Sequence, residues 1–452
     1  MRNCGLFEIC AAVGGTLLQG ADLSVQDVTI DSRTARSGEL YIALVGERTD
    51  GHRYVEAALT AGAAAAVVSQ MPEKLMSGKG YILVPDTQEA LKALATWYRR
   101  QFNIPFVQVT GSAGKTTTKE MIASVLSRHY RTLRTEGNLN NHVGTPLMLL
   151  RLRPEHEMAV IETGMSHFGE IRYMGEMVQP DVAVITNVGD AHMGNLDGTR
   201  RGVLQAKCEI FENLRPNGIA VLNGDDELLR DIALHQETVF CGKREGCHVR
   251  ISDVTERGIN GTDCTVTTAG DVYRLHIASP GGYMVYPAAM AIAIAERMGL
   301  DHREIVEGIA DYRSVGSRMR VVRMPGERII IDDCYNANPQ AMAEALRLLS
   351  LTDCRRRIAV LGDMGELGIG SEQAHRRLGN LAGSCGLNAL ITIGEQAKWI
   401  AEAAGGGAQW FPTIADATEA LRRLFTPGTA VLVKASHSMG FTQVVEELEK
   451  VQ

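Results

Sequence analysis

The segment VTGSAGKTTTK, residues 109 to 119, contains residue types that bind phosphate. A glycine loop at the start of a helix presents backbone N–H groups and the positive end of the helix to an anion. Lys115 can neutralise β- and γ-phosphate oxygens, and Thr116 can bind Mg²⁺. The pattern G-x-x-x-x-G-K-[ST] is only partly matched, because Val109 stands where its first Gly would be. A glycine-rich turn without chemistry is the alternative, but we favour a site for a nucleoside triphosphate.

Polar residues follow two further apolar runs of the chain. Glu162 ends the run MAVIE, and Asn187 and His192 follow the run VAVIT. The carboxyl ends of parallel strands share one edge, where ligands bind, so we expect these three residues near Lys115. Each has an ordinary alternative, since Glu162 could cap a helix and His192 could be a packed or solvated side chain. Lys207, in the helical stretch LQAKCEIF, is by default a solvated lysine.

The elements that must position these residues alternate between strands and helices. FVQVTG predicts a strand that enters the glycine loop, and the pattern predicts a helix over 115–130. Before them, LYIALVG and YILVP predict strands around an Ala-rich helix over 54–66. A third series begins after residue 313 with RIIIDDCYNANP, RIAVLGDMGELG, ALITIG and AVLVKAS. The sequence therefore predicts an α/β protein with three domains, residues 1–103, 104–312 and 313–452.

Length and composition exclude several classes of protein. A chain of 452 residues exceeds what one hydrophobic core usually serves. A net charge of −7 argues against a protein that coats nucleic acid. The N-terminus does not resemble a signal peptide, and no apolar run reaches about 18 residues, so we expect a cytoplasmic protein without a membrane span. Nine Cys contain no C-x-x-C pair, which favours reduced thiols over disulfides or a zinc site.

Nine motifs along the chain resemble, in their order and spacing, the Mur ligases of peptidoglycan synthesis. They are TGSAGKTTT, EGNLNNHVGTPL, IETGMSHFGEI, ITNVGDAHMGNL, QAKCEIF, LNGDDE, IIIDDCYNANP, LGDMGELG and VLVKAS. The resemblance runs from about Asp31 to Val445, and these ligases also lack the first Gly of the phosphate loop. DDCYNANP together with LGDMGELG is similar to the family member that adds D-alanyl-D-alanine to a UDP-N-acetylmuramoyl tripeptide.

The resemblance implies a three-domain Mur ligase architecture. Its N-terminal domain would bind the UDP-substrate, its central P-loop ATPase-like parallel-sheet domain would bind ATP, and its C-terminal Rossmann-like domain would close over both. The cofactors implied are ATP, a pair of Mg²⁺ ions and a carbamylated lysine. The partners implied are the UDP-N-acetylmuramoyl tripeptide and D-Ala-D-Ala, with no nucleic acid, and we expect a monomer.

The resemblance also assigns roles to individual residues. Lys115, Glu162, His192 and Lys207 are the expected catalytic residues, with Thr116 and Glu162 on the first metal and His192 and carbamylated Lys207 on the second. Further nucleotide-binding residues are Gly111, Ser112, Ala113, Gly114, Thr117 and Asn141, joined after closure by Arg318, Asp333, Asn336 and Asn338. The substrate-binding candidates are Ser32, Arg33, Asp50, His52, Asn138 and Asn140, for which ordinary turn chemistry is the alternative explanation.

The chemistry of amide formation explains this set of residue types. A carboxylate does not accept an amine until ATP converts it into an acyl phosphate. Phosphoryl transfer brings anionic reactants together, so cations and a lysine are needed to neutralise their charge. The amine then attacks the acyl carbon, and the same cations can stabilise the oxyanion.

Two segments depart from the family pattern. GGYMVYPAAMA replaces G-x-H-N-x-x-N-A-x-x-A, so Tyr283 and Pro287 stand where a His and an adenine-binding Asn are usual. KASH replaces K-G-S-R, which leaves the role of His437 open. The third stem residue, lysine or diaminopimelate, is also left open.

Two alternative functions follow from these patterns. One is a related ligase with another acceptor, such as a different Mur ligase or a folylpolyglutamate synthetase, and the YNANP motif speaks against it. The other is a non-catalytic nucleotide-binding relative, which the GYMVYP departure makes worth testing. A guanine-binding N-K-x-D motif is absent, which disfavours a GTPase switch.

Overall fold

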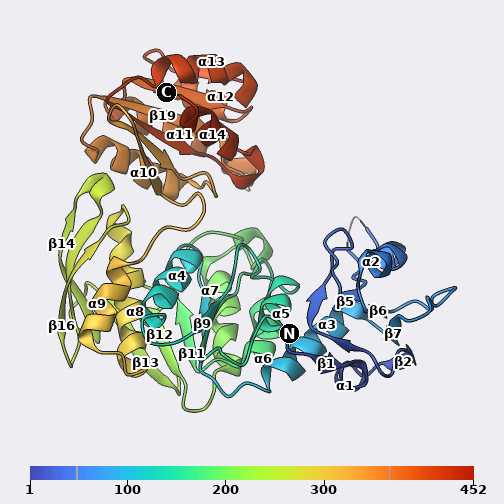
Figure 1. Ribbon diagram of the computed structural model, residues 1–452. Helices are drawn as coiled ribbons and strands as arrows, with labels where there is room; N and C mark the ends of the chain where they lie inside the picture. The colour runs from blue at the N-terminus through green and yellow to red at the C-terminus, as the bar shows by residue number, and fades with distance from the viewer. Residues whose placement is uncertain (47–48, 366, 452) are drawn as a thin grey trace. The chain divides into compact units, whose positions relative to one another are not determined.

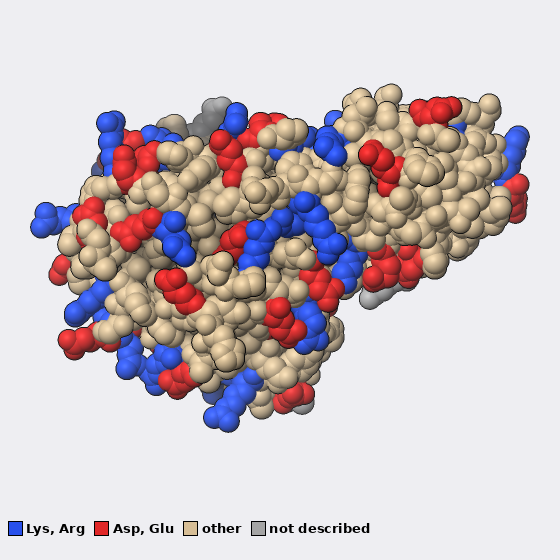
Figure 2. Space-filling view, turned by 90° about the horizontal axis from the view of Figure 1, so that it is seen from below, with Lys and Arg blue, Asp and Glu red and all other residues tan. Residues whose placement is uncertain are grey.

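The computed structural model describes residues 1–46, 49–365 and 367–451, and it divides into two compact units (Figure 1). The first unit comprises Met1–Arg250 and Tyr286–Gly308, and the second comprises Ile251–Val285 and Ile309–Gln452. None of the helices described is long and apolar enough to cross a membrane. Figure 2 shows acidic and basic side chains interspersed over one face, apart from a short arc of adjoining basic side chains.

The first unit begins with a five-stranded sheet in the order β2-β7-β6-β5-β4. Its last four strands are parallel, and β2 is antiparallel to β7. The strands of this region are β1 (Cys4–Gly5), β2 (Thr16–Gln19), β3 (Ser24–Val25), β4 (Asp27–Thr29), β5 (Glu39–Ile42), β6 (Ala65–Val68) and β7 (Gly80–Leu83). The helices are α1 (Leu6–Ala12), the 3-10 helix η1 (Gly51–Tyr54), α2 (Val55–Ala61) and α3 (Thr87–Arg99).

The helix predicted over 54–66 is shorter in the structure. It ends at Ala61, because Gly62 has a φ of 136° and the following residues 65–68 form the buried strand β6. A run of alanines suits a helix by propensity, but burial between two neighbouring strands decides the outcome here.

The same unit contains a parallel sheet in the order β13-β12-β11-β8-β10-β9. Its strands are β8 (Phe106–Thr110), β9 (Thr132–Arg134), β10 (Met158–Glu162), β11 (Val182–Ile185), β12 (Ile219–Asn223) and β13 (Glu237–Gly242), with the start of β14 (Val249–Glu256) beside β13. Strands β8, β10 and β11 are buried along their whole length, as expected for a parallel sheet covered on both faces.

Helices and short turns connect these parallel strands. They are α4 (Lys115–Leu126), α5 (Gly144–Leu149), α6 (Glu170–Val178), η2 (Met193–Asn195), α7 (Arg200–Cys208) and η3 (Glu209–Asn213). The helices η5 (Gly282–Met284), α8 (Val285–Arg297) and α9 (His302–Ala310) come after these strands in the chain. The strand, loop and helix predicted around the glycine loop are confirmed, although α4 ends at Leu126 rather than at residue 130.

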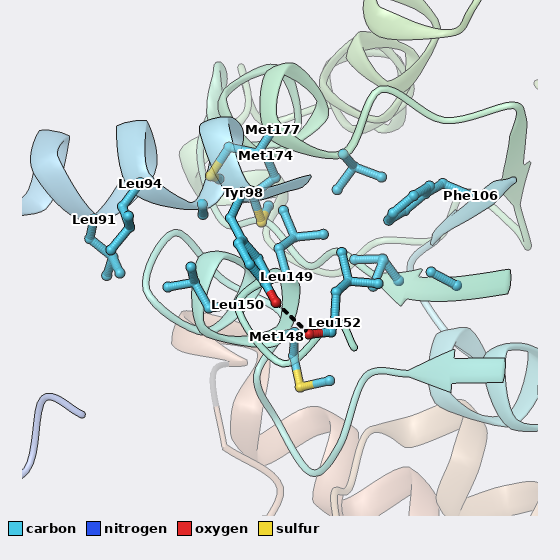
Figure 3. Close-up of a cluster of buried hydrophobic side chains, with 14 of the residues drawn as sticks. Leu91, Leu94, Tyr98, Phe106, Met148, Leu149, Leu150, Leu152, Met174 and Met177 are labelled. Carbon is cyan, nitrogen blue, oxygen red and sulfur yellow. Dashed lines mark hydrogen bonds between the residues drawn. The ribbon is translucent and has the colours of Figure 1, made fainter. Parts of the chain in front are cut away.

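The two sheets of the first unit share one hydrophobic core through α3 (Figure 3). Leu91, Leu94 and Tyr98 of this helix belong to the same buried cluster as Phe106 of β8 and side chains of α5 and α6. The Tyr98 hydroxyl donates to the backbone oxygen of Leu152 at 2.8 Å. The boundary predicted near residue 103 therefore separates two sheets that are packed on a common helix.

The second unit contains a six-stranded sheet in the order β17-β18-β22-β19-β20-β21, parallel except for β17. Its strands are β17 (Arg320–Met324), β18 (Arg328–Asp332), β19 (Arg356–Gly362), β20 (Ala389–Ile393), β21 (Gln409–Phe411) and β22 (Thr429–Lys434). The helices are α10 (Pro339–Leu351), η6 (Gly368–Gly370), α11 (Ser371–Ser384), α12 (Ala397–Ala404), α13 (Ile414–Leu424), η7 (His437–Met439) and α14 (Thr442–Glu449). The four strands predicted for this series are confirmed.

Successive residues of these strands face two different cores. Ile331 and Leu432 belong to one buried cluster, whereas Ile330 and Val433 belong to another. This alternation is the period-two pattern of a strand that is buried on both faces. The unit also contains η4 (Gly258–Asn260) and the antiparallel pair β15 (Thr262–Thr267) and β16 (Val272–Ile277), which is not among the predicted elements.

Candidate functional site

The predicted phosphate loop lies between β8 and α4, at the carboxyl edge of the parallel sheet. The segment after β11 holds this loop, because Ser112 N donates to Asn187 O at 3.0 Å and Ala113 N donates to Asn187 Oδ1 at 2.9 Å. Gly111 has a φ of 153°, and a Cβ at this position would lie 1.8 Å from Thr186 Oγ1. Only glycine fits there. The predicted position of Asn187 beside the loop is confirmed.

The N-terminus of α4 is arranged to receive an anion. Gly114, with a φ of 75°, precedes the helix, and the first turn carries no acidic residue. The half-buried Lys115 side chain lies over the loop, with its Nζ donating to Gly111 O at 2.9 Å and to Ser112 O at 3.4 Å. Helix N–H groups and an ammonium group at one position make a strong phosphate site.

The hydroxyl of Thr116 and the carboxylate of Glu162 meet beside this loop. Thr116 Oγ1 donates to Glu162 Oε2 at 2.8 Å, and both residues are buried. Asn140 Nδ2 donates to Glu162 Oε1 at 2.7 Å, and Glu162 N donates to Thr135 Oγ1 at 2.9 Å. The carboxylate is therefore held by two separate segments of the chain, and the backbone of Glu162 is held by a third.

This pair of oxygen ligands fits Mg²⁺. That ion usually binds one or two carboxylates together with substrate phosphates and water. Within the described parts of the chain there is no group of three His, Cys, Asp or Glu side chains that could hold a metal ion alone. Thr116 and Glu162 thus form a partial ligand set, which a nucleotide bound at the adjacent loop can complete.

Lys207 lies on α7 and is buried, with 3% of its surface exposed. Burial lowers the pKa of its ammonium group well below the ordinary value, and the positive charge of Lys115 lowers it further. The neutral amine is the form that can react with CO₂. His192, the other ligand predicted for the second metal, is exposed at the start of η2 with a φ of 63°, and its role stays a prediction.

Three of the candidates for the UDP-substrate, Arg33, Asp50 and His52, lie in two hydrogen-bonded pairs. Asp50 Oδ1 lies 2.6 Å from His52 Nδ1, and His52 Nε2 accepts from Ser69 N at 2.8 Å. Arg33 binds Asp31 with two parallel hydrogen bonds of 2.9 and 2.7 Å, which lowers the pKa of that carboxyl to about 2.

A buried tyrosine is affected by the charges of both pairs. Burial, with the charges of Asp31 and Asp50, raises the pKa of Tyr41 to about 12. Both carboxylates therefore lie near Tyr41. Ser32, which stands between Asp31 and Arg33 in the sequence, is half-buried. The binding of uridine by these residues stays a prediction.

In the second unit, charged residues gather at the carboxyl edge of the sheet. Lys434, at the end of β22, forms a buried ion pair with Asp333 and donates to Asn336 O at 2.8 Å. Asp333 Oδ1 also accepts from Met319 N at 3.0 Å. Burial raises the pKa of the Asp333 carboxyl, and the Lys434 ammonium opposes that rise. The Arg318 guanidinium lies 3.3 Å from the centre of the Tyr335 ring.

Two of the predicted nucleotide-binding Asn residues accept hydrogen bonds from backbone N–H groups at helix starts, and Asn338 is the N-cap of its helix. Asn141 Oδ1 accepts from Val143 N and Gly144 N, at 3.1 and 2.7 Å, at the start of α5. Asn338 Oδ1 accepts from Ala341 N at 2.9 Å at the start of α10. These contacts match the cap preference of Asn, so ligand binding by either residue stays a prediction.

Three family models match the chain in succession. The Mur ligase family catalytic domain matches residues 24–99, the Mur ligase middle domain matches 109–295, and the Mur ligase glutamate ligase domain matches 317–437. The UDP-N-acetylmuramoyl-tripeptide–D-alanyl-D-alanine ligase of Escherichia coli (strain K12) is 35% identical over 96% of each chain. The chain belongs to the Mur ligase family. The predicted family and three-domain architecture are confirmed.

Solved structures agree with this assignment. A crystal structure of MurF from Acinetobacter baumannii superimposes with a TM-score of 0.93 at 32% identity, and 99% of each chain is covered. The MurF ligase of Thermotoga maritima, solved in complex with ADP, has a TM-score of 0.81 at 29% identity, covering 94% of this chain and 97% of that one. This Mur ligase therefore shares its fold with solved relatives that match nearly its whole length.

The departure from the usual Mur ligase pattern lies at the start of α8. Pro287 is the third residue of this helix, where its missing N–H costs no internal hydrogen bond. Tyr283 is exposed in η5, and the Tyr286 hydroxyl donates to Asp225 Oδ2 at 2.9 Å. The segment thus presents tyrosines instead of the side-chain amide that is usual in the family.

Several residues that make contacts in this Mur ligase are not among the candidates selected from the sequence. Lys119, buried on α4, donates to Thr135 O at 2.6 Å, and Thr135 Oγ1 in turn accepts from Glu162 N. Lys434 ends the apolar run AVLVK, so the strand-end rule that selected Glu162 would also have selected this lysine. His437, whose role the sequence leaves open, lies 5.4 Å from Tyr335 between ring centres.

Proposed function

We propose that this Mur ligase joins D-alanyl-D-alanine to UDP-N-acetylmuramoyl tripeptide with the consumption of ATP. The contact between Thr116 and Glu162 beside the phosphate loop supports the nucleotide and metal chemistry. The identity of the acceptor is supported by relatives of that activity that match over nearly the whole length of the chain. Because the reaction uses ATP and a UDP-linked precursor, we place it in the cytoplasm.

The first step activates the terminal carboxylate of the tripeptide. A carboxylate oxygen attacks the γ-phosphorus of ATP, the bond to the β-phosphate oxygen breaks, and ADP leaves. Lys115 neutralises oxygens of the transferred group, and the helix N-terminus of α4 orients the phosphates. Thr116 and Glu162 would hold Mg²⁺, which neutralises charge on the phosphate oxygens when bound.

The second step forms the amide. The amino nitrogen of D-alanyl-D-alanine attacks the acyl carbon, loses a proton, and inorganic phosphate leaves. Stabilisation of the oxyanion requires positive charge fixed near the acyl group, which Lys115 supplies and to which a metal held by Thr116 and Glu162 would add. Each turnover thus converts one ATP to ADP and phosphate for each pentapeptide formed.

Lys207 has a distinct place in this proposal. An ammonium group has no lone pair and repels a cation, so this residue can act beside a metal only in another form. The neutral amine that burial favours can attack CO₂, forming an N–C bond and releasing a proton. The resulting carbamate supplies anionic oxygens of the kind that Mg²⁺ binds, and with His192 it would serve a second metal.

A product assay tests the proposed function. The protein is incubated with ATP, Mg²⁺, D-Ala-D-Ala and either the lysine or the diaminopimelate tripeptide, and pentapeptide and phosphate are measured. We expect equal amounts of the two products with at least one tripeptide. Failure to form pentapeptide and to release phosphate with either tripeptide would contradict the proposal.

A further inference from the structure

We propose that Lys119 is a positioning residue that fixes the backbone at Glu162 and thereby sets the affinity of the site formed by Thr116 and Glu162 for a divalent cation. The inference rests on the proposed function, because it concerns the cation that phosphoryl transfer from ATP requires. Neither chemical step described above uses Lys119, although only 1% of its surface is exposed. A buried ammonium group is stable only with partners, so the partners of Lys119 indicate what it does.

Lys119 lies on the buried face of α4 that begins at the predicted metal ligand Thr116. Lys119 and Glu120 follow Thr116 by three and four positions, so the three buried side chains lie on one face of the helix. Thr116 donates to Glu162 at the end of β10. Lys119 reaches Thr135, directly after the adjacent strand β9. This face of α4 therefore contacts the carboxyl ends of two neighbouring strands.

Hydrogen bonds connect Lys119 to Glu162 through a single residue. The Lys119 ammonium group donates to Thr135 O at 2.6 Å. Thr135 is completely buried, and its Oγ1 accepts from Glu162 N at 2.9 Å. Its backbone N donates to Val160 O at 3.1 Å, which continues the pairing of β9 with β10. Lys119 thus fixes the position of the residue that holds the backbone of Glu162.

The other partner of Lys119 is Glu120, with which it forms a buried ion pair. The second carboxylate oxygen of Glu120 binds Arg134 Nε at 2.9 Å, and the Arg134 side chain is half exposed. An apolar side chain of similar size at position 119 would avoid the cost of burying this ion pair. It could not donate to Thr135 O, so that hydrogen bond distinguishes the lysine from an apolar side chain.

The arrangement acts on the metal through the orientation of Glu162. Its carboxylate accepts from Thr116 and Asn140, and the hydrogen bond with Thr135 fixes the backbone from which it extends. Mg²⁺ takes few protein ligands and demands near-ideal octahedral geometry, so a small change in the direction of the carboxylate weakens binding. Replacing residues that orient metal ligands typically costs about 10–100-fold in metal affinity. For Lys119, which acts through one intermediate residue, we expect a loss at the lower end of that range.

Replacements at Lys119 and Thr135 separate this role from core packing. Lys119→Met keeps a long apolar side chain and loses the hydrogen bond to Thr135. Thr135→Val keeps the shape of the side chain and leaves Glu162 N without its acceptor, whereas Thr135→Ser keeps the hydroxyl. Arg134→Gln, which removes the half-exposed partner of Glu120, is the matched control. Because Lys119 acts through Thr135, the double variant Lys119→Met/Thr135→Val should bind metal no more weakly than the weaker of the two single variants.

The experiment measures metal binding directly, without turnover. Mn²⁺, which accepts the same oxygen ligands as Mg²⁺, is titrated into the full-length protein with ADP, and free Mn²⁺ is measured by electron paramagnetic resonance, with ADP alone as the blank. We expect Lys119→Met and Thr135→Val each to raise the Mn²⁺ dissociation constant roughly tenfold. Thr135→Ser and Arg134→Gln should stay close to the parent. The Mg²⁺ concentration for half-maximal rate should follow the same order, and the unfolding midpoint without metal and nucleotide reports general damage.

Three outcomes would overturn the inference. An unchanged Mn²⁺ dissociation constant in a folded Lys119→Met would show that the lysine only fills the core. Equal constants in Thr135→Val and Thr135→Ser would show that the hydroxyl does not hold the site, and this pair decides the question even if Lys119→Met does not fold. Effects of the two single variants that multiply in the double variant would show that Lys119 acts by another route. A parent protein that forms no pentapeptide would instead contradict the proposed function.

Discussion

Two buried lysines, Lys207 in the first unit and Lys434 in the second, differ in the charges that surround them. Lys207 lies in the last turn of α7 and Lys434 at the carboxyl end of β22, with 3% and 2% of their surface exposed. Lys434 forms an ion pair with Asp333 and donates to a backbone oxygen. The charge that acts on the pKa of Lys207 is another cation, Lys115.

This difference shows how the environment of one residue type selects its chemistry. A buried ammonium is stable when a carboxylate and carbonyl oxygens surround it, and Lys434 meets that condition. A buried lysine beside a second cation loses its proton easily and becomes a nucleophile. We therefore expect Lys434 to act as a fixed charge and Lys207 to act through a chemical modification.

The largest effect expected from this comparison is at Lys207. We predict that Lys207→Ala lowers kcat by on the order of 10³ or more, because an anionic metal ligand is lost, and that acetate partly restores activity. Lys207→Arg should remain inactive, since a guanidinium group keeps its charge and cannot form a carbamate. Steady-state rates with and without acetate test this, and a fully active Lys207→Arg would show that the residue is an ordinary cation.

The cation beside Lys207 should matter nearly as much. Lys115→Ala removes a positive charge from the transferred phosphoryl group and leaves the loop backbone in place, so we predict a loss in kcat on the order of 10²–10³. The circular dichroism spectrum and unfolding midpoint should match those of the parent. A variant that keeps most of its activity would contradict the assignment of the phosphate loop.

In the free energy of unfolding, we expect the larger loss at Lys434 and not at Lys207. Lys434→Met leaves the Asp333 carboxylate buried without its partner, and we predict a loss of about 3–5 kcal/mol in the free energy of unfolding. Lys207→Met leaves no buried carboxylate without its partner, because burial and the charge of Lys115, and no acidic group, determine the pKa shift of Lys207, so this variant should not destabilise. Lys450→Met, which removes an exposed partner of Glu447, is the control and should change stability by less than about 1 kcal/mol. Urea unfolding of the three variants measures this order, and equal losses at Lys434 and Lys207 would contradict it.

The smallest effect concerns the nucleotide base, which neither lysine contacts in this account. The start of α8 has tyrosines and Pro287 where a side-chain amide is usual, so we expect weak rejection of other purines. The ratio of kcat/KM for ATP to that for GTP should be about 10² or less, as for a pocket whose side chains make no hydrogen bonds to the polar groups of the base. A ratio near 10⁴ would show that another group, such as a backbone amide, recognises adenine.

The parts of the fold that sequence could predict are those with long buried runs. Strands β8, β10, β18 and β22 are continuous apolar segments, and their polar ends located the phosphate loop and Glu162. The β15–β16 hairpin is not among the predicted elements. Its buried residues alternate with half-exposed residues in β15 and with exposed residues in β16, and the Thr and Asp residues of β15 also suit turns.

The contacts that complete the site lie between residues far apart in the chain. Asn140 reaches Glu162 across 22 positions, and Lys434 reaches Asp333 across 101. The sequence gives the residue type at each position, but which residues form pairs depends on the order of the strands in the sheets. The same limit explains why the contact between Lys119 and Thr135 follows from the structure and not from the segment VTGSAGKTTTK.

Carbon-13 NMR in the presence of ¹³CO₂ tests the central claim most directly, because it observes the modification itself. The account predicts one carbamate signal for each parent molecule, lost in Lys207→Ala and in Lys207→Arg, and retained in Lys434→Met. Absence of the signal from the parent, or its persistence in Lys207→Ala, would contradict the claim that Lys207 is the lysine that acts as a neutral amine.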